Sequence, residues 1–255
     1  MNEHTDTNER LSTGAQMRAI TISREYGSGG GEIARRLAAS LGWQLVDHEV
    51  VVRVARELGV SEAEVEAFDE HSAGLVSHLI ASMRSVDPAL LVNIPDEARV
   101  ESEETYHDAL QRVVQAAARE GHVVIVGRGG QMALGDQRAV LHIRIIAPLD
   151  KRVVYVMQRE GLGQEDARAR IQLKDRDRQR YLHAQYRQSS DNPHLYDLVI
   201  NTGVLDMDSA VALILLALER KALKLQVPET ELGPGAGSQR YTGRPGDFRP
   251  PASMS

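Results

Sequence analysis

The sequence contains no cysteine, which excludes disulfide bonds and thiolate metal sites and fits a reducing compartment. It also has no apolar run of membrane-spanning length. The longest run, AVALILLAL at residues 210–218, is too short to cross a bilayer. The first nineteen residues are polar and lack the apolar segment of a signal peptide. These absences predict a cytoplasmic protein with no membrane partner.

The sequence has no excess of basic residues over acidic ones. The 30 Lys and Arg residues are outnumbered by 36 Asp and Glu residues, giving a net charge of -6. Bulk electrostatics therefore argues against nucleic acid as a partner. The nine histidines show no H-E-x-x-H or comparable spacing, and we predict no metal site made by protein ligands alone. No G-x-S-x-G motif of a serine hydrolase is present.

What the chain does contain is a regular alternation of short apolar runs with helical patterns. Val/Ile/Leu-rich runs of this length are typical of a sheet covered on both faces. The alternation predicts parallel strands joined by right-handed crossovers, hence a three-layer α/β domain. We predict strands at 19–23, 44–47, 122–127, 139–147 and 197–201, and helices at 31–41, 48–58, 104–120, 149–160, 164–188 and 206–224. Binding sites in such sheets lie beyond the carboxyl ends of the strands.

The two ends of the chain differ from the middle in composition. Residues 1–18 have almost no large apolar side chains, and residues 225–255 are rich in Pro, Gly and Ser. Neither segment buries enough apolar surface to offset the entropy lost on ordering. We predict disordered tails at 1–18 and 225–255, and one folded domain at 19–224.

The stretch ITISREYGSGGGEIARRLA, at residues 20–38, places a glycine cluster between a predicted strand and a predicted helix. Gly27, Gly29, Gly30 and Gly31 allow successive backbone N–H groups to turn inward as a nest for an anion. The N-terminus of the following helix adds partial positive charge, and Ser28 offers a hydroxyl donor. This pattern predicts a phosphate-binding loop.

The loop departs from the G-x-x-x-x-G-K-[ST] motif at three positions. Arg24 stands at the first glycine, Gly30 at the lysine and Gly31 at the magnesium-binding hydroxyl. A strand-to-helix connector without a ligand is the alternative, but four glycines each cost about 0.5–1 kcal/mol relative to alanine in an ordered element. A dinucleotide-binding loop would need an acidic residue about twenty positions downstream, at the end of the second strand. Asp47 lies near that distance, but its place at the end of the strand is ambiguous, and this alternative depends on it alone. Arg24, a permanent cation with a planar donor fork, is the predicted replacement for the lysine.

Four blocks of the sequence, in order, resemble the cytidylate kinase-like family of P-loop proteins over about residues 18–224. They are SREYGSGGGEIARRLAASLGWQLVDHEVV, VVIVGRGG, KDRDRQRY and YDLVINT. The resemblance implies a three-layer P-loop kinase-like fold with a five-stranded parallel sheet and helices on both faces. It further implies a helical insertion for the acceptor nucleotide, which fits residues 61–103, and a mobile lid at 161–188. Residues 61–103 fit a dimer surface equally well, so a homo-oligomer stays open.

The family's lysine-free SRxxGSGG loop implies that Ser23 and the loop glycines bind the phosphates of the nucleotide. The resemblance also places four residues at the acceptor: Asp47, His48, Arg53 and Arg128. His48 replaces a serine near the cytosine, and Gly129 replaces an aspartate that recognises the acceptor nucleoside. The alternatives from the residues themselves are a helix N-cap for Asp47, a solvated helix face for Arg53 and a structural ion pair for Arg128.

Residues 165–187 resemble the lid and hold seven Arg or Lys residues against four acids. The bias toward arginine favours bidentate phosphate contacts over an ordinary solvated helix. The family motif D-x-x-R can be read in two overlapping registers, Asp175 with Arg178 or Asp177 with Arg180, with each acid orienting the arginine one turn later. The sequence does not choose between them, although the following Tyr181 favours the first. The lid candidates are Asp175, Arg176, Asp177, Arg178 and Arg180.

These residues predict an ATP-dependent phosphotransferase whose acceptor is a nucleoside monophosphate, with CMP or dCMP as the first guess, or a similar small molecule. The loop and Arg24 would hold the donor phosphates, and Arg178 or Arg180 would act on the transferring group. Mg²⁺ is expected with ATP, bound mainly through the phosphates. A non-catalytic nucleotide sensor or partner-binding module is the alternative. The missing lysine and the missing aspartate favour it, whereas the retained arginines favour the kinase.

Overall fold

The computed structural model describes residues 16–47, 103–135 and 137–233, with side chains of the first helix after the gap described from residue 111. The predicted helix 48–58, most of the 61–103 insertion, and residues 1–15 and 234–255 of the predicted tails lie outside the described residues. None of the helices in the described part is long and apolar enough to span a membrane.

Five strands form one parallel sheet in the order β2-β3-β1-β4-β5. The central strand β1 pairs with both β3 and β4, so that Ile22 lies opposite Val126 on one side and Ile143 on the other. The strands are β1 (Ala19–Arg24), β2 (Gln44–Val46), β3 (Val123–Val126), β4 (Val140–Ile146) and β5 (Leu198–Asn201). The predicted five-stranded parallel sheet is confirmed, and each predicted strand overlaps an observed one.

The helices follow the strands in the predicted alternation. They are α2 (Gly30–Leu41), α7 (Glu103–Glu120), α8 (Gly130–Ala133), α9 (Leu149–Glu160), α10 (Gln164–Tyr186) and α11 (Met207–Ala222), with short 3-10 turns η1 (Pro193–Leu195) and η2 (Glu229–Glu231). The four-residue α8 was not predicted, since it begins in the Gly129–Gly130 pair.

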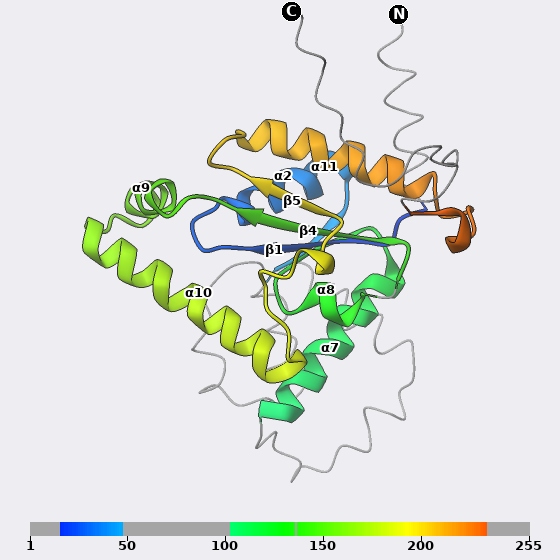
Figure 1. The fold of residues 1–255 in the computed structure, drawn as a ribbon, viewed down its shortest axis with the longest axis horizontal. Coiled ribbons are helices and arrows are strands. Elements are labelled where there is room, and N and C mark those ends of the chain that lie inside the picture. Colours follow the sequence, from blue (N-terminus) through cyan, green and yellow to red (C-terminus); the bar gives the residue numbers. More distant parts are fainter. Residues whose placement is uncertain (1–15, 48–102, 136, 234–255) are drawn as a thin grey trace, which may run out of the picture.

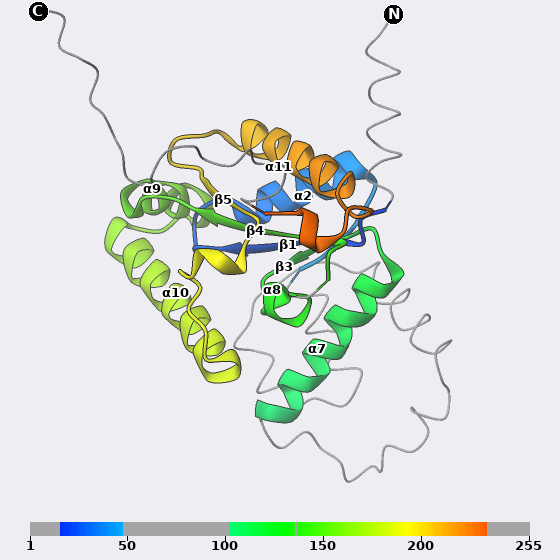
Figure 2. The ribbon, with the colours of Figure 1, turned by 45° about the vertical axis from the view of Figure 1, so that its right-hand side comes forward.

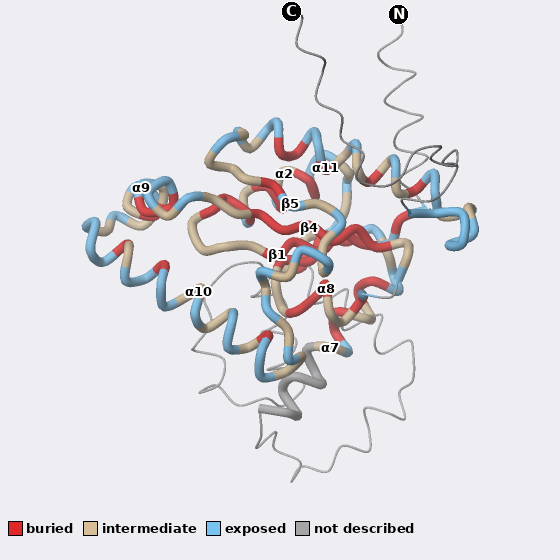
Figure 3. The backbone as a smooth tube through the Cα atoms, viewed as in Figure 1, coloured by how far each residue is buried: buried red, intermediate tan, exposed pale blue. Residues whose placement is uncertain are grey.

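The helices cover both faces of the sheet (Figures 1 and 2). Alternate strand residues point to opposite faces. Ile20 and Ile22 therefore share a core cluster with residues of α2 and α11, whereas Ala19 and Ile125 share one with residues of α7 and Leu134. The buried segments run through the strands and the inner sides of these helices (Figure 3). A third, smaller cluster joins α9 to α10 through Val153, Val156, Ala167 and Ile171.

Both predicted tails include residues that belong to the fold. Met17 is fully buried in the main core. Leu225 packs against the same core, and Arg138 donates hydrogen bonds to the carbonyls of Lys224 and Val227. The predicted boundaries at 18 and 225 are therefore wrong by a few residues, because single apolar side chains near the ends find places in the core.

Candidate active site

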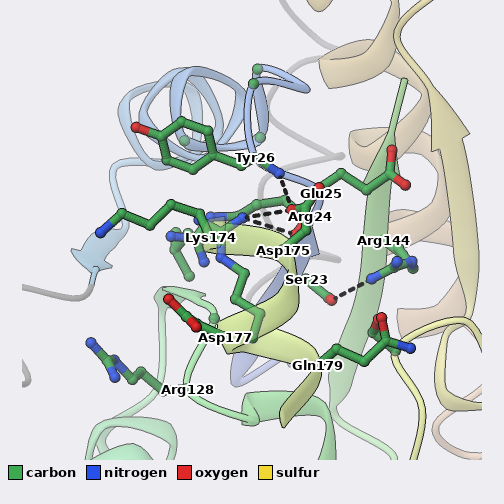
Figure 4. A pocket seen from close by; sticks show the side chains of 18 of the residues that line it. Ser23, Arg24, Glu25, Tyr26, Arg128, Arg144, Lys174, Asp175, Asp177 and Gln179 are labelled. Carbon is green, nitrogen blue, oxygen red and sulfur yellow. Dashed lines mark hydrogen bonds and ion pairs between the residues drawn. The ribbon is translucent and has the colours of Figure 1, made fainter. Parts of the chain in front are cut away.

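A cavity of about 730 Å³ lies at the carboxyl edge of the sheet. The lining comes from the glycine loop after β1, the end of β2, the segment after β3, residue 144 on β4, one side of α9, α10 and residues 190–191 (Figure 4). The loops that leave parallel strands at their carboxyl ends meet at one edge of the sheet, which brings these distant segments together. Thirteen charged side chains line this cavity, seven of them Lys or Arg and six Asp or Glu.

The glycine loop packs closely on its surroundings. Gly27 and Gly29 adopt left-handed φ angles of 81° and 79°, which favours glycine at both positions. A Cβ at Gly27 would lie 2.9 Å from Val156, so the loop rests on α9 without room for a side chain. Gly29 caps the N-terminus of α2, where the helix offers N–H donors and partial positive charge to an anion.

The Arg24 side chain lies beside Gly30, the position that a lysine occupies in the common phosphate-loop motif. A Cβ added to Gly30 would lie 2.8 Å from the Cβ of Arg24, and one added to Gly127 would collide with the Arg24 guanidinium. The arginine side chain thus runs past Gly30 toward the segment after β3. Burial, together with the nearby cations Arg178 and Arg128, lowers the pKa of Arg24 well below its usual value. Such a group of cations is stabilised when an anion is bound among them.

Arg128 is held in an unfavourable backbone conformation. Its φ of 57° is left-handed, and it stands between Gly127 and Gly129, whose φ angles are 79° and 62°. This conformation costs a residue with a side chain on the order of 1–2 kcal/mol. Burial lowers the pKa of Arg128 to about 10, and nearby Tyr181 and Asp47 partly oppose that shift. Strain at a half-buried cation that lines a cavity is more typical of a binding site than of a structural turn.

The space above Gly129 is taken by an aromatic ring. A Cβ at Gly129 would lie 2.7 Å from Cε2 of Tyr186, at the end of α10. The Tyr186 hydroxyl accepts a hydrogen bond of 3.2 Å from Gln111 on α7, and its ring stands edge-on to Tyr181. An acidic side chain at position 129 therefore has no room in this arrangement.

One side of α10 faces the cavity, with Lys174, Asp175, Asp177 and Arg178 among its lining residues. Arg178 donates a hydrogen bond of 3.3 Å to the Arg24 carbonyl and lies 3.7 Å from Asp175. Its guanidinium also stands 5.3 Å from the centre of the Tyr26 ring. Burial lowers the pKa of Arg178, and Asp175 partly opposes that shift.

Arg180, predicted as catalytic, does not line this cavity. It lies with Arg176 and His183 along a separate groove on the outer side of α10. Arg178 lines the cavity, whereas Arg180 lines only that groove. In this arrangement the Asp175–Arg178 register faces the site.

Two predicted loop residues play different parts. The Ser28 hydroxyl donates to the carbonyls of Glu25 and Ile145, and the residue is 2% exposed and does not line the cavity. The Ser23 hydroxyl lines the cavity and accepts a hydrogen bond of 3.2 Å from Arg144. Asp47, directly after β2, lines the cavity. His48 and Arg53 lie outside the described residues.

Several charged residues near the cavity were missed from the sequence. Arg144 lies in the middle of the apolar run VLHIRII, where a lone cation is a readable signal, and it pairs with Asp191 at 2.9 Å. Arg152 has the sequence pattern of a surface residue on α9 but is only 8% exposed. Glu25 also lines the cavity, as does the uncharged Tyr26. Within the described ranges, no three His, Asp or Glu side chains are grouped so as to hold a metal ion.

A family model described as the cytidylate kinase-like family matches residues 19–204, which include all the segments around the cavity. The chain belongs to the cytidylate kinase-like family. This membership supports a nucleotide kinase-type function and confirms the resemblance on which the sequence interpretation rests.

Relatives of this family member include two archaeal proteins described as cytidylate kinases. The one from Ignicoccus hospitalis is 26% identical over 200 residues, covering 78% of this chain and 97% of the relative. The one from Thermococcus kodakarensis is 28% identical over 203 residues, covering 78% of this chain and 87% of the relative. A protein from Corynebacterium glutamicum described as a uronate isomerase is 34% identical over 142 residues, which cover 56% of this chain. That match spans only 26% of the isomerase, about a quarter of its length.

A solved structure of an uncharacterised protein from Eubacterium ventriosum has the same fold. Its TM-score is 0.59 at 20% identity, covering 79% of this chain and 98% of that protein. At this identity the likeness concerns the fold alone.

Proposed function

We propose that this family member transfers a phosphoryl group from ATP to a small phosphate-bearing acceptor. The observation that carries the proposal is the gathering of three half-buried arginines, Arg24, Arg128 and Arg178, around one cavity beside a glycine loop. They come from three separate segments. Buried cations that lower one another's pKa are costly in an empty protein and favourable around phosphates.

The donor side of the cavity is the glycine loop. ATP would place its β- and γ-phosphates against the loop N–H groups and the N-terminus of α2. Arg24 would supply the cation that a lysine supplies in the common motif. Mg²⁺ would accompany ATP and take most of its ligands from phosphate oxygens and water. The protein then needs to supply only one or two carboxylate ligands. Asp47 and Asp177 line the cavity and fit that limited requirement.

The acceptor side is the segment after β3. Arg128 would bind the acceptor phosphate, and Asp47, together with His48 and Arg53 outside the described residues, would complete the site. CMP and dCMP are the first candidates because the archaeal relatives are described as cytidylate kinases. Gly129 lacks the acidic group that would read the base, and Tyr186 fills that space. Base recognition would therefore depend on other residues, such as Tyr181, which lines the cavity beside Arg128.

The transfer itself requires positioning and charge stabilisation rather than covalent help from the protein. An oxygen of the acceptor phosphate would attack the γ-phosphorus of ATP while the bond to the β–γ bridging oxygen breaks, and ADP would leave. Arg178, held over the loop by its bond to the Arg24 carbonyl, would stabilise the negative charge of the transition state. Helix α10 would exclude water that otherwise hydrolyses ATP.

The test is a panel of nucleoside monophosphates with ATP and Mg²⁺, in which ADP release is followed against an acceptor-free control. Turnover with an acceptor supports the proposal and names the substrate. If ATP binds and no acceptor raises ADP release, the non-catalytic nucleotide sensor, favoured by the missing lysine and by Gly129, is the better function. If ATP does not bind at millimolar concentration, both proposals fail.

A further inference from the structure

Arg152 on α9 joins the glycine loop to the lid helix α10 although it does not line the cavity. Its Nη1 atom donates a hydrogen bond of 3.2 Å to the Tyr26 carbonyl and lies 2.5 Å from Oδ2 of Asp175. Its Nε atom lies 3.6 Å from a carboxylate oxygen of Glu25. Two of these partners belong to the loop and one to α10. A buried guanidinium with such partners is costly to remove, because the carboxylates around it would remain.

Asp175 is the second member of this connection. Its Oδ1 atom accepts a hydrogen bond of 2.7 Å from the backbone N–H of Tyr26, as Figure 4 shows. The same carboxylate binds Arg152 and lies 3.7 Å from Arg178. One acidic side chain thus links a backbone amide of the loop, a buried cation of α9 and a cation that faces the cavity. A fixed carboxylate restricts where the arginine one turn later on the helix can lie.

We propose that Arg152 is a positioning residue for phosphoryl transfer, acting through Asp175 to hold the glycine loop and α10 in the arrangement that places Arg178 over the cavity. The inference rests on the proposed function. The planar guanidinium suits this task, because its Nη1 atom donates to both the Tyr26 carbonyl and Asp175, while its Nε atom lies 3.6 Å from Glu25 without a hydrogen bond. Lysine keeps the charge but not that geometry.

The docking of α10 can be measured without any activity. The segment from 168 to 187 contains seven Lys or Arg residues, so trypsin cleaves it when the helix leaves the loop and α9. We expect Arg152→Gln and Asp175→Asn each to raise the rate of cleavage in this segment at least tenfold, measured by mass spectrometry on the intact chain without nucleotide. Because both changes remove one connection, the double variant should be cleaved at about the rate of the faster single variant. Arg152→Lys should fall between Arg152→Gln and the wild type.

Arg36→Gln is the matched control. Arg36 is also a helix arginine bound to two carboxylates, Glu32 and Asp208, but it lies on α2 and does not line the cavity. Its cleavage pattern should be that of the wild type. If Arg152→Gln does not fold, Asp175→Asn decides the question, because Asp175 is partly exposed and its asparagine still accepts the Tyr26 N–H.

Kinetics then separate positioning from simple stabilisation. With an acceptor found in the panel, Arg152→Gln should lower kcat at least tenfold while the Kd for ATP and the acceptor KM change less than threefold. Unchanged cleavage in both single variants would overturn the proposal. Faster cleavage with unchanged kcat would also overturn it and would leave Arg152 a purely structural residue. If the wild type turns over no acceptor, the proposed function fails, while the cleavage rates still decide whether Arg152 docks α10.

Discussion

Arg24 is the cation on which the donor side of the proposed site depends, because it occupies the space beside Gly30 where a lysine is missing. Arg24→Ala should lower ATP affinity or turnover at least tenfold, about 1.4 kcal/mol. Isothermal titration calorimetry with Mg²⁺ and ATP measures the first quantity, and Arg36→Ala serves as the control. An unchanged Kd and an unchanged kcat together would show that the loop binds phosphate without Arg24.

The arginines at the acceptor and on the lid should separate in their kinetic effects. Arg128→Ala should mainly raise the acceptor KM, because Arg128 would bind the acceptor before and during transfer. Arg178→Ala should mainly lower kcat, because it would stabilise charge that develops only in the transition state. Arg180→Ala is the matched control from the outer side of the same helix and should change neither constant much. A loss of kcat in Arg180→Ala equal to that in Arg178→Ala would mean that α10 turns its other side to the ligand.

The ring of Tyr186 leaves no room for a side chain at position 129. Gly129→Asp should destabilise the fold by about 1–3 kcal/mol, since the new side chain overlaps the Tyr186 ring. In a Tyr186→Ala background the same substitution should cost less, which urea unfolding of the two single variants and the double variant would measure. Equal costs in both backgrounds would show that the ring moves aside readily.

At the scale of secondary structure elements, strands β1 and β4 share a buried polar contact below the site. His142 on β4 lies 2.7 Å from the Thr21 hydroxyl on β1, and its backbone N–H donates to Asp197, which also binds Lys221. Burial lowers the pKa of His142 to about 4 from its ordinary 6.5, against the opposing effect of Asp197. Neutral His142 is therefore part of the folded sheet.

This shift makes stability depend on pH. Between pH 6.5 and about 4 the unfolded chain binds a proton at His142 that the folded chain does not. The contribution of His142 is complete above that range and falls as the pH drops, by up to about 1.4 kcal/mol per pH unit. Urea unfolding of the wild type and of His142→Gln between pH 7 and 4.5 should give a smaller loss in the variant. Parallel curves would mean that His142 titrates normally in the folded chain.

At the scale of the whole molecule, the limits of the folded domain can be tested by truncation. Removal of 1–15 and 234–255 should leave the melting temperature unchanged, because their composition predicts little buried apolar surface. Ending the chain at residue 223 instead should lower it, since Leu225 and the carbonyls bound by Arg138 are lost. Differential scanning calorimetry of the three chains compares them directly. A lower melting temperature after the first truncation would show that the ends dock on the domain.

The sequence by itself determined the elements of this protein and the general place of its site. Hydrophobic periodicity depends on near neighbours, so five parallel strands and most helices could be predicted with small errors at their ends. The glycine cluster, Arg24 and Arg128 were equally readable, because each follows a strand and has a local pattern. Arg144 could also have been identified as a candidate site residue, because it is a lone cation in an apolar run. The strand was predicted there, but this residue was not singled out.

Only the tertiary structure decided which side chains face the cavity. The sequence left both D-x-x-R registers open, with Tyr181 favouring Asp175–Arg178, and the docking of α10 on α9 and the loop turns Arg178 inward and Arg180 outward. The roles of Ser28 and Arg152 depend in the same way on partners far away in sequence, at Ile145 and Asp175. Local propensity specifies that a helix or a turn forms. The rotation of that element about its axis follows from the long-range contacts it makes, and no local pattern encodes them.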